Sequence, residues 1–215
     1  MNRTNRTVSV TATESVEVPA ELAIVEIGCQ SFGETREAVL EDNFRTSQRI
    51  TEAVERVGVP KANIQTSNLR LSQIFENDKV LEQIARGRRF VANQGWQVQV
   101  SAERADSVIE AATRAGANVL GTVRWTVRDP AALEGRAAAV AMMRVRKVAE
   151  EMAAGLGGKL GELIYASNEL ETRYEVGGGV FAGEGPGVGP EQRSLRLFPQ
   201  KVSRRASVHA VFALQ

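Results

Sequence analysis

The stretch from residue 105 to residue 157 constrains the fold most, because it contains two helices and a strand together with the signals that start and stop them. Apolar residues recur on one helical face before Gly116, which is typical of the stop after a helix. An alternating pattern then predicts a half-buried strand. Asp129 and Pro130 are typical of an N-cap and the first helical position, and Gly157 stops that second helix. This stretch is therefore expected to be structural, with no side chain placed for catalysis.

The patterns in the rest of the chain predict an α+β fold. A helix is expected to start at Thr35, with a buried face made of Leu40, Phe44, Ile50, Val54 and Val57. A turn is expected at residues 16–19, and alternation predicts strands at 8–11, 25–30, 64–75, 90–101, 160–166 and 206–214. The order ββα-ββα-βα-ββ predicts a mainly antiparallel sheet with helices packed on it. We expect a single domain over residues 1–215, with its core between about 8 and 214.

One segment between the last two strands is expected to lack regular structure. Seven of the fourteen residues from 177 to 190 are glycine. Glycine at this density favours a flexible loop over a helix or strand. Its spacing does not match GxGxxG, so it does not predict a dinucleotide site.

Single copies of two reactive residue types restrict the chemistry. Cys29 is the only cysteine and His209 the only histidine, which excludes an intrachain disulfide and a multi-histidine metal site. Cys29 alternates with apolar residues and is expected to be a buried, inert thiol. His209 lies between Val208 and Ala210 and is expected to point away from the core, at the surface or an interface. Only a nearby acid or serine would make it a base.

Other polar groups are expected to be structural. The segment Gly155–Lys159 closes a helix and has Leu160 where a phosphate loop needs Ser or Thr. The net charge is +1, so no general field favours nucleic acid, and no apolar run is long enough to span a membrane. Solvated charge is expected for three sets: the arginines at 86, 88, 89, 193, 196, 204 and 205, the pair Glu150-Glu151, and Glu169 with Glu171. Core positions are expected for Trp96 and Trp125.

Several short motifs occur in an order that resembles the SIMPL-domain family, which includes a periplasmic immunogenic protein. They are residues 8–14 (VSVTATE), Val18-Pro19, 58–66 (GVPKANIQT), 69–72 (LRLS), 115–118 (AGAN), 129–133 (DPAAL), an alanine-rich helix and Leu156-Gly157. The chain departs from the family pattern at Arg89-Phe90, where relatives usually have Gly-Tyr. The resemblance implies an α+β fold, large homo-oligomers (a channel-like ring in one relative) and no established catalytic activity or catalytic residues.

The expected function is therefore non-enzymatic self-assembly, in an envelope- or stress-associated protein with no catalytic residue, cofactor or metal. One alternative is a small-molecule or lipid-binding module with its entrance near 177–190. Another is a hydrolase that pairs His209 with an acid. The N-terminus lacks the apolar region of a signal peptide, which favours the cytoplasm, whereas most family members carry an export signal, which implies the periplasm or envelope.

Overall fold

The computed structural model describes residues 6–75, 88–169 and 196–215. The chain divides into two compact units, one formed by residues 1–19, 127–175 and 201–215 and the other by 20–126 and 176–200. We call the first the three-stranded unit and the second the four-stranded unit, after their sheets. Both sheets are antiparallel, so the predicted α+β class is confirmed, but with two sheets where the sequence suggested one. The predicted 177–190 loop lies outside the described residues.

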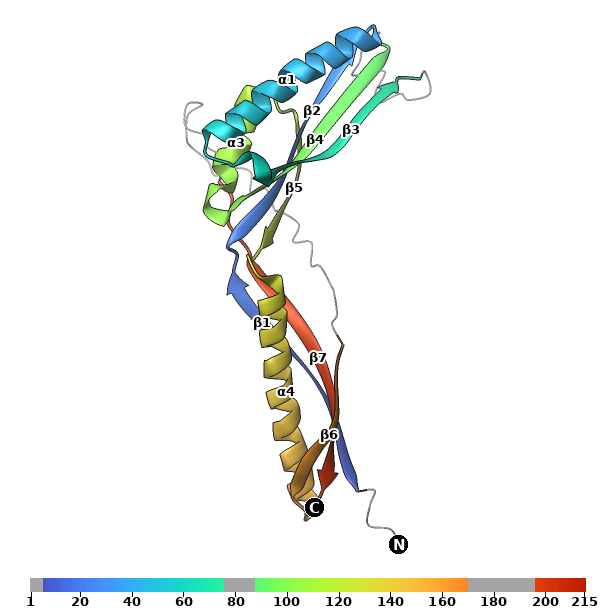
Figure 1. Cartoon of the computed structure of the whole chain (residues 1–215), viewed down its shortest axis with the longest axis vertical. Helices are drawn as coiled ribbons and strands as arrows, with labels where there is room; N and C mark the ends of the chain where they lie inside the picture. Colours follow the sequence, from blue (N-terminus) through green and yellow to red (C-terminus); the bar gives the residue numbers. More distant parts are fainter. Residues whose placement is uncertain (1–5, 76–87, 170–195) are drawn as a thin grey trace, which may run out of the picture. The chain divides into compact units, whose positions relative to one another are not determined.

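The four-stranded unit consists of one antiparallel sheet with two helices on one of its faces (Figure 1). The spatial order of the strands is β3-β4-β2-β5. Two short 3-10 helices, η2 and η3, interrupt the predicted element order, which otherwise holds approximately. The elements are β2 (Leu22–Gly33), α1 (Arg36–Arg56), η2 (Lys61–Asn63), β3 (Ile64–Gln73), β4 (Phe90–Ser101), η3 (Ala102–Arg104), α3 (Ala105–Ala115) and β5 (Val119–Thr126).

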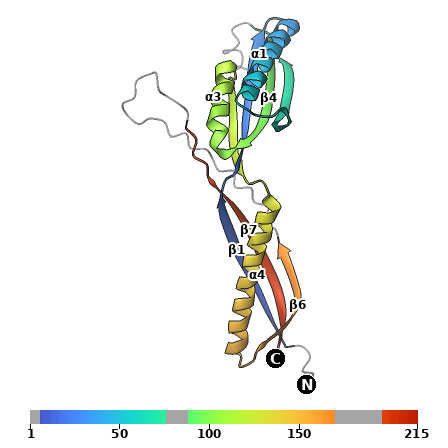
Figure 2. The ribbon, with the colours of Figure 1, turned by 60° about the vertical axis from the view of Figure 1, so that its left-hand side comes forward.

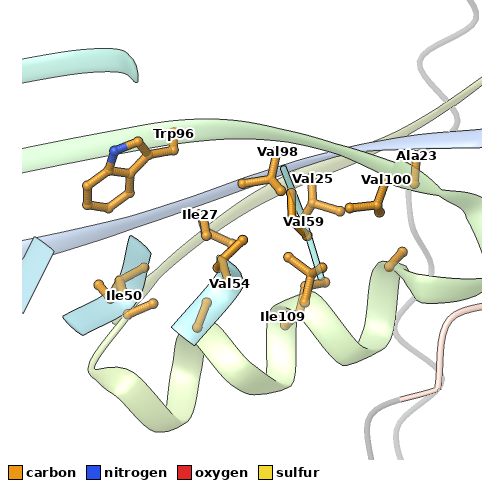
Figure 3. Close-up of a cluster of buried hydrophobic side chains, with 14 of the residues drawn as sticks. Ala23, Val25, Ile27, Ile50, Val54, Val59, Trp96, Val98, Val100 and Ile109 are labelled. Carbon is orange, nitrogen blue, oxygen red and sulfur yellow. The ribbon is translucent and has the colours of Figure 1, made fainter. Parts of the chain in front are cut away.

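The core of this unit lies between the sheet and its helices (Figure 3). Trp96, Val98 and Val100 point inward from β4, as their alternation predicted. Ile50 from α1 and Ile109 from α3 close the cluster from the helical side. Trp125 was also expected in the core, but it is only partly buried, because β5 is the edge strand of the sheet.

The buried face of α1 differs from the predicted one. Leu40 and Phe44 are 43% and 65% exposed, and Asn43 is buried in their place. The described buried set is Val39, Asn43, Thr46, Ser47, Ile50 and Val54. At 100° per residue these positions span about 100° of the helix surface, whereas the predicted set spans about 140°. The prediction was right for Ile50 and Val54, but it included Leu40 and Phe44 beyond one margin of the stripe and omitted Asn43, Thr46 and Ser47, which are polar.

The three-stranded unit places one long helix along one face of a sheet of order β1-β7-β6 (Figure 2). Its elements are β1 (Thr7–Pro19), α4 (Pro130–Gly155), β6 (Leu160–Glu169) and β7 (Lys201–Leu214). Every fourth residue of α4 is buried: Leu133, Ala137, Ala141, Val145, Ala149 and Ala153. Because four of the six are alanine, the helix backbone can lie close to Val8, Val10 and Phe212 of the sheet.

All three strands of this unit are longer than predicted, β1 and β7 by the most. β1 and β7 pair along their whole length, from Thr7 opposite Ala213 to Pro19 opposite Lys201. The turn expected at residues 16–19 is therefore wrong, and β7 starts before the predicted residue 206. Pro19 fits this strand because β1 lies at the sheet edge, where the missing N–H costs little.

Candidate functional site

His209 lies on the face of the three-stranded sheet that α4 does not cover. Its neighbours Val208 and Ala210 are buried toward α4, so the predicted outward direction is confirmed. The Thr11 hydroxyl lies 3.0 Å from Nδ1, and the Tyr165 ring centroid lies 6.2 Å from that of the imidazole. Neither neighbour is an acid that could orient the ring as a general base.

Cys29 belongs to a small polar cluster buried under α1. Asn43 Nδ2 donates to Cys29 Sγ at 3.4 Å, and Ser47 Oγ lies 3.6 Å from the same sulfur. Ser47 Oγ also donates to Gln94 Oε1 at 2.6 Å. Burial raises the pKa of the Cys29 thiol, and the hydrogen bonds with Ser47 and Asn43 oppose this only in part. The predicted burial of Cys29 is confirmed, and its inertness stays a prediction.

We expect Cys29 to react with thiol reagents only when the four-stranded unit opens. Burial limits access, and the raised pKa keeps the thiol protonated in the folded protein at pH values where an exposed cysteine ionises. Unfolding restores the ordinary pKa, so the unfolded state gains reactivity, and stability is lost as pH rises through the ordinary thiol pKa. Labelling should therefore be slow in buffer and complete in denaturant. Rapid stoichiometric labelling of the folded protein would contradict the assignment.

Two of the charged groups that the sequence singled out, Arg204 and Glu150, take part in ion pairs. Arg204 Nε lies 3.5 Å from Glu134 Oε1 and connects β7 to α4. Arg146 pairs with Glu150 one helical turn away, as expected for an exposed helix charge. Arg86, Arg193 and Glu171 lie outside the described residues. Within the described ranges no group of three or more His, Cys, Asp or Glu side chains is arranged to hold a metal ion.

The glycine motif at residues 155–159 has the structural role that the sequence predicted. It begins at Gly155, the last residue of α4, and Gly157 is in the left-handed region at φ 73°. The N–H of Gly158 donates back to the carbonyl of Ala153 at 2.9 Å, which closes the last turn. A phosphate loop would present its N–H groups at the start of a helix, and this motif lies at the end of one.

Asn118, from the motif AGAN, links the start of β5 to β2 through two hydrogen bonds. Its Oδ1 accepts from the N–H of Gln30 at 2.7 Å, and its Nδ2 donates to the Gln30 carbonyl at 2.9 Å. The side-chain amide thus replaces a backbone pair at the point where β5 begins. Gly116, with φ 116°, ends α3 and brings Asn118 into this position. This motif therefore serves the fold, and the same holds for Asp129, whose carboxylate caps α4 by accepting from the Ala132 N–H at 2.9 Å.

Asn118→Ala is expected to lower the free energy of unfolding by about 1–3 kcal/mol, because two backbone groups of Gln30 lose their partners. Asn118→Asp keeps the acceptor, loses the donor and places a charge beside the Gln30 carbonyl, so it should also destabilise. Denaturant titration of both variants against the wild type measures the effect. Wild-type stability in both would show that the two hydrogen bonds contribute nothing.

The surface feature with most potential for binding is a set of exposed apolar side chains at the sheet edges. Fourteen large apolar residues of the described chain are exposed, and seven of them lie on edge strands. These seven are Leu69 and Leu71 on β3, Val119 and Leu120 on β5, and Leu163, Ile164 and Tyr165 on β6. The sequence analysis missed this feature because alternating apolar residues are the same in a covered strand and in an uncovered edge strand.

Comparison with protein families gives one match that spans both units. The family model described as SIMPL, protein of unknown function (DUF541), matches residues 8–212. No curated protein matches the chain. Among the described helices, none combines the length and apolar character that crossing a membrane requires.

Proposed function

Since the chain belongs to the SIMPL family, whose molecular function is unknown, we propose that it is a non-enzymatic protein that acts by assembling with copies of itself. The observation that carries this proposal is the placement of the exposed apolar residues. Three of the four sheet edges carry large apolar side chains that are more than a third exposed. Strand edges also offer unpaired backbone groups, and apolar edges of this kind favour pairing between chains.

The chemistry of the edges supports association over enzymatic function. The fourth edge, β1, is polar and carries Glu14, Glu17 and Pro19, which are residues that discourage pairing. Because one edge is protected and the others are apolar, copies of the chain are expected to associate at specific edges, which differs from non-specific aggregation. His209, the base in the hydrolase alternative, has the Thr11 hydroxyl and the Tyr165 ring as described neighbours, with Ser167 opposite it on β6.

Sedimentation velocity over a range of protein concentrations tests the proposal. We expect a species larger than a dimer that persists at high salt, because apolar contacts are not screened as ion pairs are. A monomer at all concentrations would overturn the proposal and favour the small-molecule or lipid-binding alternative. Loss of the large species at high salt alone would show that charge, rather than the apolar edges, holds the assembly.

A further inference from the structure

β3 has the least protected edge of the four-stranded sheet. It is the outermost strand on its side (Figure 1), and among the described strands it pairs with β4 alone. Its pairing is regular from Asn68, opposite Gly95, to Gln73, opposite Phe90. This stretch of six residues contains one charge, Arg70, and no proline. It therefore presents a straight row of backbone donors and acceptors without the usual blocks to pairing.

Apolar side chains line the helix-facing side of this edge. Leu69 lies opposite Gln94 and Leu71 opposite Ala92, and residues directly opposite each other share a face. Gln94 accepts a hydrogen bond from Ser47 of α1, so this is the face that the helices cover. Leu69 is nevertheless 66% exposed, because α1 packs on β2 and β4 and leaves β3 open.

α1 adds two apolar side chains to the same area. Thr46 lies on the side of α1 that faces Gly116, the residue that ends α3. A Cβ atom added to Gly116 would lie 3.2 Å from Thr46 Cγ2. Leu40 and Phe44 lie about 120° and 160° around the helix from Thr46, on the side toward β3. Together with Phe75, which follows β3, they extend the area around Leu69 and Leu71, and we call these five residues the β3 patch.

We propose that two copies of this chain join through antiparallel pairing of their β3 edges. The two-fold axis runs perpendicular to the sheets, so that the β3 patches of both copies meet on the helical side. This inference rests on the proposed self-assembly and names one of its interfaces.

A second copy fits this edge better than a different partner because the edge is complementary to itself. A two-fold axis perpendicular to the sheets places the helix-covered faces of both copies on the same side. Apolar residues of one β3 edge therefore lie beside apolar residues of the other, and polar residues beside polar residues. The exposed fractions of the β3 patch correspond to roughly 550 Å² per copy, at about 200 Å² for a fully exposed side chain. Complete covering of both patches would bury about 1,100 Å² in addition to the strand edges, against a minimum of about 1,000 Å² for a stable interface.

The first test compares two double variants by native mass spectrometry. Leu69→Lys with Leu71→Lys places two charges in the interface, and we expect the particle mass to fall about twofold or more. Ser107→Lys with Thr113→Lys adds the same charge at exposed positions of α3, which packs on α1 and β2, and should keep the wild-type mass. All four positions are on the surface or at its margin, so circular dichroism should stay unchanged in both proteins.

The outcomes separate this inference from the proposed function. A wild-type monomer overturns self-assembly and β3 pairing together. A wild-type oligomer whose mass survives Leu69→Lys with Leu71→Lys overturns β3 pairing alone, and loss of stability at unchanged mass would show that the patch is covered within its own chain.

A cysteine scan decides the matter if the lysine variant fails to fold. Each position from 68 to 72 is changed to cysteine in turn, in a Cys29→Ser background, and oxidised under mild conditions. In a two-fold antiparallel pair one position lies on or beside the axis, where its Cβ meets its own copy at about 4.5–5.5 Å. We expect a covalent dimer from one position, with little from its neighbours. No covalent dimer at any of the five positions would overturn the inference.

Discussion

Trp96→Ala is expected to lower the free energy of unfolding of the four-stranded unit by about 3–5 kcal/mol, a large part of the total for a domain. Trp96 is 3% exposed and packs in one cluster with Ile27 and Ile50, so its removal leaves a cavity between β4 and the helices. Denaturant titration followed by the fluorescence of Trp125 reports on the same unit, because both tryptophans belong to it.

Trp125→Ala is the matched control for this prediction. Trp125 is partly buried on an edge strand, so its truncation removes fewer contacts, and we expect a smaller loss than for Trp96. The fluorescence of Trp96 then follows the unfolding. Equal losses in the two variants would contradict the assignment of Trp96 to the centre of the core and Trp125 to its margin.

Ala141→Leu is expected to destabilise the three-stranded unit by about 1–3 kcal/mol or more, because the site has no room for added carbon atoms. Ala141 is fully buried where α4 contacts the sheet, in one cluster with Val10 and Phe212. The added side chain must push α4 away from β1 and β7. Thermal unfolding followed by far-UV circular dichroism measures the change, since α4 is the longest helix among the described elements.

The exposed residue Ala139 provides a control on the same helix. Ala139→Leu makes the same substitution two residues earlier on the solvent side, where both residues favour helix and no neighbour is displaced. We expect its unfolding temperature to stay close to that of the wild type. A similar fall in both variants would show that the alanine stripe is not the contact surface of α4.

The sequence predicted most of the fold because its local signals are strong. Gly116, Asp129 and Gly157 mark helix ends by backbone chemistry that needs no tertiary contact, and each has that role in the structure. The alternation around Trp96 likewise set the inward face of β4 correctly. These are features that a single segment carries by itself.

The errors arose where long-range contacts decide the outcome. Residues 16–19 extend β1 because β7 pairs with them from about 185 positions away, and no local pattern carries that information. Asn43 and Ser47 are buried because Ala92 and Gln94 supply hydrogen-bond partners across the core. The separation of the strands into two sheets depends in the same way on which strands pair.

The candidate site was harder to predict than the fold. The sequence singled out Cys29 and His209 and assigned both to structural or surface positions, and the structure places them so. The β3 patch was not foreseen, because Leu69 and Leu71 alternate like core residues and only the position of α1 decides whether they are covered. Exposure at a sheet edge follows from helix placement, which the sequence alone does not give.

Native mass spectrometry of the full chain at micromolar concentration tests self-assembly most directly, because it counts the copies in each particle. We expect a homo-oligomer larger than a dimer, with a mass that is a whole multiple of 23.3 kDa and no additional bound group. A monomer of 23.3 kDa would contradict the proposed assembly. An added mass that persists on gentle activation would contradict the absence of a cofactor and favour a ligand-binding module.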